Sequence, residues 1–415
     1  MMVGQQITKE GDTMKRLFVL SCLFYLLIGI TSVMTGPLLP EMLPYYERGY
    51  GDGGTLLFLQ FAGFLVGVLA SPGWAARIGK HRLLSVALIS IAVPYAVMGF
   101  LPGWLWMVLL TLLVGFGSGI IESTIGAFTI EFAEQNKAIA MTQLDVYFGV
   151  GALLMPAAIS LLIAAGWWPY AFMAASAFTF VLLALWLTLP GRSSERLRSP
   201  NAAMASSTSA KKRYTGGQFR LLAAFVVFFF VYMGLELGLM NFLPSILVET
   251  VQIGNSTASL GVTSFWIAMV VGRLFAGKVA ERMSYVPFLL WSAIGTLVFI
   301  TALTMTAHPV GVLALILGIG LTMSGLFSIA LVHANILIPG MTERTTSILI
   351  ASGGIGGSVL QWFIGWSMAR WSAGSTLWLL MGFTLILLLS VVLSFLWKEA
   401  SQGSLSLQAG NRFME

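Results

Sequence analysis

The chain has 415 residues, of which 58% are hydrophobic and 9% are charged, and its mean hydropathy is +0.90. This composition excludes a soluble globular domain and is typical of a protein that crosses a membrane many times. The net charge of +6 comes from basic residues that lie between apolar segments, so we expect no nucleic-acid partner. One cysteine, Cys22, and three scattered histidines predict no intrachain disulfide, no metal site and no cofactor.

Twelve apolar runs are each long enough to cross a bilayer as a helix, which takes about 20 residues. They lie near residues 17–40, 55–76, 83–101, 105–130, 141–165, 169–190, 221–247, 257–280, 286–306, 310–338, 346–368 and 376–397. The predicted fold class is therefore all-α membrane, with twelve transmembrane helices. The first run has no small-residue cleavage signal, so we interpret it as a retained helix rather than a signal peptide.

The distribution of positive charge predicts the orientation in the membrane. An even number of spans places both termini on one side, and that side carries 19 of the 22 Lys and Arg residues. The other three are Arg48 and Arg370 on the opposite side and Arg273 within a span. The positive-inside rule then places the N-terminal tail (1–16) and the C-terminal tail (398–415) in the cytoplasm of a cell-membrane protein.

The polar, Ser/Ala-rich segment 191–220 is predicted to be a flexible cytoplasmic linker between two six-helix bundles, 17–190 and 221–397. The two bundles resemble each other at an offset of about 204 residues. Four pairs of segments align in order along the chain: 37–42 with 241–246, 66–79 with 271–284, 114–123 with 317–326, and 148–152 with 353–357. We therefore expect two pseudo-symmetric bundles related as parallel repeats.

Three carboxylates lie within predicted spans: Glu122, Asp145 and Glu236. An acid in the bilayer core costs about 3 kcal/mol or more, so such residues usually line a path for protons or substrates. Glu122 is interpreted as a proton-coupling site rather than a structural carboxylate bonded to Ser or Thr, because its repeat equivalent, Gly325, is not acidic. Asp145, about one turn into its helix, is a second proton-coupling candidate, but it could equally cap the helix or pair with loop arginines.

Glu236 lies near the middle of the seventh span and is interpreted as a ligand for substrate hydroxyls or for a cation, with a structural role as the alternative. Arg273 is the buried cation and should pair with a carboxylate. Because it belongs to the segment 271–284, the repeat of 66–79 that precedes a loop, scaffolding of a gate is an equal alternative.

Amide side chains with neighbouring aromatic residues recur at membrane depth. Such groups suit a sugar, since amides and carboxylates bind hydroxyls and aromatic faces cover C–H surfaces, although each aromatic alone could serve helix packing. With Glu236, the substrate-binding candidates are Gln60, Gln143, Tyr147, Asn241, Trp266, Asn335, Gln361 and Trp362. A single central arginine argues against anionic sugars or phosphates, so a neutral polar solute is favoured.

Two segments, 72–82 (PGWAARIGKHR) and 277–284 (GKVAERMS), resemble the loop signature of the major facilitator superfamily. That resemblance implies the major facilitator fold, substrate binding between the two halves near the midplane, and gating roles for Arg77, Glu281 and Arg282 beside Arg273. The first copy departs from the signature because Ala76 stands at the acidic position.

A more specific resemblance rests on the runs GFGSGIIESTIGAF, LDVYFGVGALLMP, NFLPSI and FWIAMVVGRLFAG. They resemble the fucose-galactose-glucose:proton symporter branch of that superfamily, and most of all its glucose/mannose members. The resemblance implies proton-coupled uptake of a monosaccharide with Glu122 as the proton or sugar ligand. Glu236 and Asn241 match the E-x4-N-F-L-P-S pattern of glucose-type members, and Gln143 falls where fucose permeases have a sugar-contacting amide. Gly36 replaces the first-helix acid of fucose permeases, which favours glucose or mannose.

We therefore expect a monomeric symporter in the lipid bilayer that takes up a monosaccharide with a proton by alternating access. The alternative is a proton-driven exporter of drugs or other lipophilic compounds. Gly149, Gly151 and Pro156 loosely resemble the proline-glycine signature of antiporters in the fifth helix. A membrane enzyme would need clustered nucleophiles, bases or metal ligands, and the sequence shows none, so no enzymatic activity is expected.

Overall fold

The structure is a computed structural model of the chain. Its backbone is described for residues 2–132, 137–188, 214–306, 308–339 and 341–412, and its side chains for 16–129, 143–188, 214–306, 308–339, 341 and 344–397. Most of the predicted linker 191–220 lies outside the described residues. Its last five residues belong to helix α8, which begins at Gly216 because Thr215 and Gln218 form a capping box at its N-terminus. The predicted end of the linker at residue 220 is therefore too late.

Twelve helices among the described residues are long and apolar enough to cross a membrane, as the sequence predicted. The first extends from Arg16 to Tyr45 and the last from Ala373 to Trp397. The tenth differs from the prediction of one continuous helix over 310–338. It consists of α11 (Pro309–Met323) and α12 (Leu326–Leu337), separated at Ser324 and Gly325.

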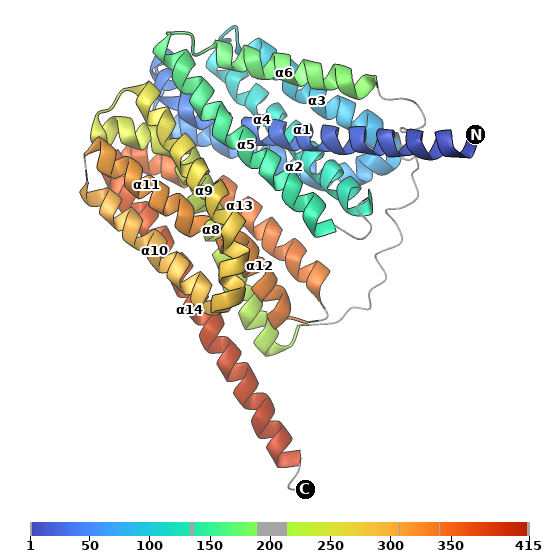
Figure 1. Cartoon of the computed structure of the whole chain (residues 1–415). Helices are drawn as coiled ribbons and strands as arrows, with labels where there is room; N and C mark the ends of the chain where they lie inside the picture. Colours follow the sequence, from blue (N-terminus) through green and yellow to red (C-terminus); the bar gives the residue numbers. More distant parts are fainter. Residues whose placement is uncertain (1, 133–136, 189–213, 307, 340, 413–415) are drawn as a thin grey trace. The chain divides into compact units, whose positions relative to one another are not determined.

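The first of two compact units contains the six N-terminal helices, shown from blue to green in Figure 1. Their bounds are α1 Met2–Tyr45, α2 Tyr50–Ile78, α3 Lys80–Met98, α4 Trp104–Phe132, α5 Lys137–Ala164 and α6 Tyr170–Leu187. Within this unit α2 packs along α4, α1 packs along α5, and α3 packs against both α4 and α6. Buried aliphatic and aromatic side chains such as Phe24, Leu84 and Phe172 fill the space between them.

Glycines allow α2 and α4 to approach with their backbones in contact. A Cβ atom added to Gly63 or Gly67 of α2 would overlap the carbonyl groups of Leu112 or Phe116 on α4. The arrangement is reciprocal, because a Cβ atom on Gly115 of α4 would overlap a carbonyl of α2. Small residues at such an interface provide packing where lipid supplies no hydrophobic driving force between helices.

The second unit contains the C-terminal helices, shown from light green to red in Figure 1. They are α8 Gly216–Val251, most of α9 Asn255–Met283, α10 Tyr285–Met305, α11, α12, α13 Thr342–Arg370 and α14 Ala373–Arg412. Here α8 packs along α13 and α14, and α10 packs against α11 and α14. The pairings α8·α13, α10·α14 and α10·α11 repeat those of α1·α5, α3·α6 and α3·α4, which is the pattern expected of an internal repeat.

The predicted bundle boundaries miss one feature, because residues 254–263 group with the first unit although they lie in the second half of the chain. At the start of α9, Asn255 Nδ2 donates to Glu41 Oε1 of α1 at 2.8 Å, and Ser256 Oγ donates to the Ser160 carbonyl of α5 at 2.9 Å. These hydrogen bonds hold the first turns of α9 against α1 and α5. The remainder of α9, which carries Arg273, belongs to the second unit.

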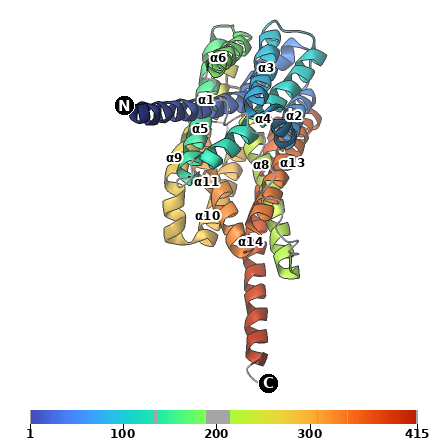
Figure 2. The same cartoon turned by 90° about the vertical axis from the view of Figure 1, so that its right-hand side faces the viewer.

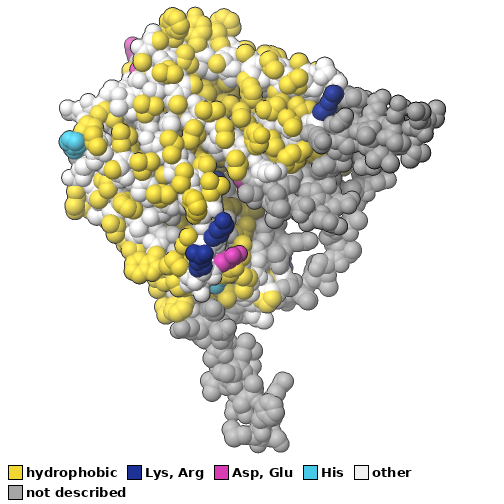
Figure 3. All heavy atoms as spheres, in the orientation of Figure 1, with side chains coloured by type: hydrophobic (Ala, Val, Ile, Leu, Met, Phe, Trp, Pro, Cys, Tyr) yellow, Lys and Arg dark blue, Asp and Glu magenta, His cyan; other side chains and the backbone are white. Residues whose placement is uncertain are grey.

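Both terminal helices continue beyond the apolar stretches that could lie in a membrane. Figures 1 and 2 show the last part of α14 extending away from the other helices of its unit. The surface shown in Figure 3 is mostly hydrophobic, with few charged side chains among the described residues. Leu69, Phe100 and Leu161 are more than 70% exposed, which suits contact with lipid.

Candidate functional site

The first unit brings two of the predicted carboxylates together. Glu122 of α4 and Asp145 of α5 interact electrostatically with each other and with the phenol of Tyr25 on α1. Tyr25 is buried, and a Cβ atom on Gly126, one turn after Glu122, would lie 3.1 Å from its hydroxyl. Two neighbouring carboxylates repel when both are charged. Asp145 is exposed in this structure. We call Tyr25, Glu122 and Asp145 the carboxylate cluster.

The second unit brings together Glu236 of α8 and Arg273 of α9. The distance from Arg273 Nη2 to Glu236 Oε1 is 3.2 Å, and the two side chains are 34% and 8% exposed. The guanidinium also lies over the ring of Trp266, 5.6 Å from its centroid. Arg273 thus pairs with a carboxylate, which is one of the two roles that the sequence left open for it.

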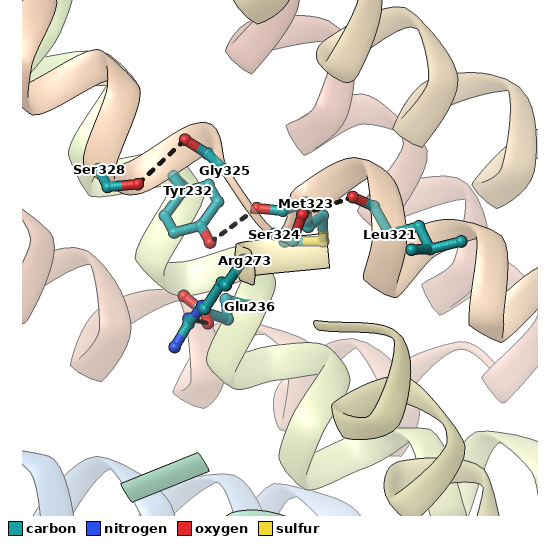
Figure 4. A network of polar contacts seen from close by, with 8 residues as sticks. All are labelled: Tyr232, Glu236, Arg273, Leu321, Met323, Ser324, Gly325 and Ser328. Atoms are coloured by element: carbon teal, nitrogen blue, oxygen red, sulfur yellow. Dashed lines mark hydrogen bonds and ion pairs between the residues drawn. The ribbon is translucent and has the colours of Figure 1, made fainter. Parts of the chain in front are cut away.

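Tyr232, one turn before Glu236 on α8, lies beside this ion pair (Figure 4). Its hydroxyl donates to the main-chain carbonyl of Met323 at 3.2 Å and interacts with both Glu236 and Arg273. Met323 is the last residue of α11, where helix carbonyls have no partner within their own helix. The ion pair therefore lies directly against the break in the tenth span.

The next turns of α8 carry a buried amide pair. Asn241 Nδ2 donates to Gln361 Oε1 of α13 at 2.8 Å and also to the Leu237 carbonyl. Gln361 Nε2 is bonded to the Gly357 carbonyl. The Oδ1 atom of Asn241 is buried without a hydrogen-bond partner, as is the hydroxyl of Ser245 one turn later. Unsatisfied buried polar atoms are costly, which sets these two atoms apart from the bonded amides around them.

Two other predicted amides have partners within their own unit. Gln60 accepts a hydrogen bond from Thr35 at 3.0 Å and donates to the Thr31 carbonyl at 2.9 Å, so its side chain joins α2 to α1. Asn335 donates to Thr346 and to the Leu331 carbonyl, while its Oδ1, like that of Asn241, is buried without a hydrogen-bond partner. These contacts give both residues a role in joining neighbouring segments.

The remaining candidates occupy different environments. Trp266 is buried at 1% exposure beside Phe265, whereas Tyr147 and Trp362 are about 40% exposed. Gln143 is exposed in the same stretch of α5 as Asp145. The gating candidates Arg77, Glu281 and Arg282 are exposed in the last turns of α2 and α9. Among the residues with described side chains, no group of three or more His, Cys, Asp or Glu residues could hold a metal ion.

Sequence reasoning missed Tyr25 and Tyr232. Tyr232 could have been found, because a residue four positions before Glu236 shares its face of a helix. The break beside it also had a signal, since the Ser324-Gly325 dipeptide is a turn signal inside an apolar run. Tyr25 had none, because its proximity to Glu122 depends on how α1 packs against α4 and α5.

The family model described as Major Facilitator Superfamily matches residues 21–246 and 224–411. The chain belongs to the Major Facilitator Superfamily. Membership confirms the predicted fold, a multi-pass membrane protein with twelve helices long enough to span a bilayer. Discontinuous helices occur at the substrate sites of several transporter folds, where unwound main chain exposes carbonyl groups.

Among curated proteins, the glucose/mannose transporter GlcP of Bacillus subtilis is 32% identical over 348 residues, which cover 83% of this chain and 86% of that protein. The glucose/galactose transporter of Brucella abortus is 26% identical over 319 residues, covering 74% and 76% of the two chains. Among solved structures, the xylose transporter XylE from E. coli in a partially occluded inward-open conformation aligns with a TM-score of 0.73. The two chains are 14% identical, and the alignment covers 93% of this chain and 98% of XylE.

Proposed function

We propose that the protein is a proton-coupled secondary transporter that takes up a monosaccharide of the glucose or mannose type by alternating access. The observation that carries this proposal is a group of charged and amide side chains in the second unit. Glu236, Asn241 and Gln361 lie buried in an apolar bundle, and the partly exposed Arg273 pairs with Glu236. Such groups bind hydroxyls, and they are expensive to retain at membrane depth without a ligand.

The relatives support the same substrate class. Two curated relatives are named as glucose/mannose and glucose/galactose transporters, and the alignments with this chain cover 86% and 76% of their lengths. The relationship to such proteins, none of which is named as an enzyme, agrees with transport rather than catalysis. We propose proton coupling through the carboxylate cluster of Tyr25, Glu122 and Asp145, because it supplies two acids on adjacent helices.

Topology and assembly complete the proposal. The excess of Lys and Arg in the tails and in alternate loops supports cytoplasmic termini in a cell-membrane protein. We further propose that the transporter acts as a monomer, that its partners are a monosaccharide, a proton and the lipid bilayer, and that Arg77, Glu281 and Arg282 act at its cytoplasmic loops.

The test is uptake of labelled glucose, mannose and fucose by proteoliposomes that contain the purified protein. With an inward proton gradient, glucose or mannose should accumulate above its external concentration, and without the gradient it should only equilibrate. Fucose should be accumulated less, because Gly36 stands where fucose permeases have an acid. If none of the three hexoses enters faster than into empty liposomes, the proposal fails.

A further inference from the structure

The hydroxyl of Tyr232 makes contact with three groups that belong to different helices. It donates to the Met323 carbonyl at the end of α11 and lies beside Glu236 of α8 and Arg273 of α9. The side chain is fully buried, and its ring packs against Phe228 and Phe327. The hydroxyl therefore has a fixed position between the ion pair and the break in the tenth span.

The break itself is held by hydroxyl groups. Ser324 Oγ donates to the Leu321 carbonyl at 2.7 Å, and Ser328 Oγ donates to the Gly325 carbonyl at 3.4 Å (Figure 4). Neighbouring residues leave little room, since a Cβ atom on Gly272, next to Arg273, would overlap Ser324. Movement at the break therefore requires adjustment beside Arg273.

We propose that Tyr232 is a positioning residue, whose hydroxyl holds the Glu236–Arg273 pair in register with the break between α11 and α12. Because it assigns Tyr232 to the substrate site, this inference rests on the proposed function. A phenol has one proton to donate. It goes to the Met323 carbonyl while Arg273 satisfies Glu236. When Arg273 turns from Glu236 to a substrate hydroxyl, the phenol donates to the carboxylate instead, and the Met323 carbonyl loses its donor. Substrate binding thereby changes the hydrogen bonding at the break in the tenth span.

The variant that tests this is Tyr232→Phe, which removes the hydroxyl and keeps the ring contacts. Tyr95→Phe is a matched control, because the Tyr95 hydroxyl is equally buried in the first unit but has no hydrogen-bond partner. Each variant is combined with Glu236→Gln, and the apparent melting temperature of the purified protein in detergent is measured for all members of both cycles. This readout needs no substrate.

Positioning predicts coupling between residues 232 and 236. The melting shift caused by Tyr232→Phe should differ by at least about 2 °C between the Glu236 and the Glu236→Gln backgrounds, whereas the shift of Tyr95→Phe should be the same in both. In uptake assays Tyr232→Phe should raise KM about tenfold, the effect expected of a lost hydrogen bond to a charged group, with a smaller change in kcat. Tyr95→Phe should leave both parameters unchanged.

Additive melting shifts at 232 and 236 overturn the inference, and so does an unchanged KM in an active Tyr232→Phe protein. If the wild-type protein transports no hexose, the proposed function fails on its own. The melting cycles then still decide whether Tyr232 positions the ion pair, since coupling supports that role and additivity refutes it.

Discussion

Glu122 and Glu236 lie in separate compact units and interact with different kinds of neighbour. Glu122 interacts with a second acid and a phenol, whereas Glu236 is paired with a guanidinium at 3.2 Å. The carboxylate of Glu236 can exchange its guanidinium partner for substrate hydroxyls, whereas Glu122 has no cationic partner among these neighbours. From these surroundings we propose proton coupling through Glu122 and substrate binding through Glu236.

Glu122→Gln should abolish proton-driven accumulation of sugar and leave counterflow exchange measurable. The amide keeps hydrogen-bonding capacity but cannot bind and release a proton. The measurement compares accumulation and counterflow in proteoliposomes, with Asp52→Asn as control because Asp52 caps the first turn of α2, a role that asparagine also fills. A Glu122→Gln protein that still concentrates sugar against its gradient would show that coupling lies elsewhere.

Glu236→Ala and Asn241→Ala should each weaken sugar binding by about 1–3 kcal/mol, the usual cost of removing a buried polar partner. The control is Ser176→Ala, which removes a buried hydrogen bond to the Ala92 carbonyl. This bond lies in the first unit, whereas the amide pair lies in the second. It should lower the melting temperature without changing affinity. Unchanged affinity in both Glu236→Ala and Asn241→Ala would assign these residues to helix packing.

At the scale of helices, the sequence predicted all twelve spans within a few residues, because hydropathy over about 20 residues reports bilayer crossing directly. It predicted neither the break at Ser324 and Gly325 nor the grouping of residues 254–263 with the first unit. Both depend on contacts between distant segments, such as Asn255 with Glu41. Gly325, the repeat equivalent of Glu122, lies at the break, whereas α4 is continuous through Glu122.

The glycines between α2 and α4 give a prediction at the same scale. Gly115→Ala should destabilise the protein by about 1–3 kcal/mol, because the added methyl group meets the Gln60 carbonyl and main chain cannot move aside as a side chain can. Gly73→Ala, near the end of α2, has open space around its Cβ position and should be neutral or slightly stabilising. Apparent melting temperatures in detergent compare the two, and equal values would refute the close contact of α2 with α4.

At the scale of the whole molecule, family and spans were predictable because composition, charge asymmetry and the internal repeat are each distributed along the entire chain. The candidate site was predictable only as a set of residue types. Glu236, Asn241 and Gln361 lie in one unit, but the sequence could not distinguish Asn241, which has an unsatisfied oxygen, from Gln60, whose amide oxygen and nitrogen each have a partner. That distinction depends on packing at single atoms.

The charge asymmetry predicts that both termini lie in the cytoplasm. Reporter fusions that are active only inside or only outside the cell should report a cytoplasmic position for both ends and for a fusion near residue 200. A fusion in the loop near Arg48 should report the opposite side. Active cytoplasmic reporters near Arg48 would contradict the predicted topology.

The most direct test of proton-coupled uptake is the sign of the proton movement that sugar itself drives. In lightly buffered proteoliposomes without an imposed gradient, external glucose or mannose should acidify the lumen, because each sugar enters together with a proton. The Glu122→Gln protein should show no such acidification. Lumen alkalinisation would indicate exchange of sugar for protons, as in an exporter, and sugar entry that depends on sodium with no pH change would contradict proton coupling altogether.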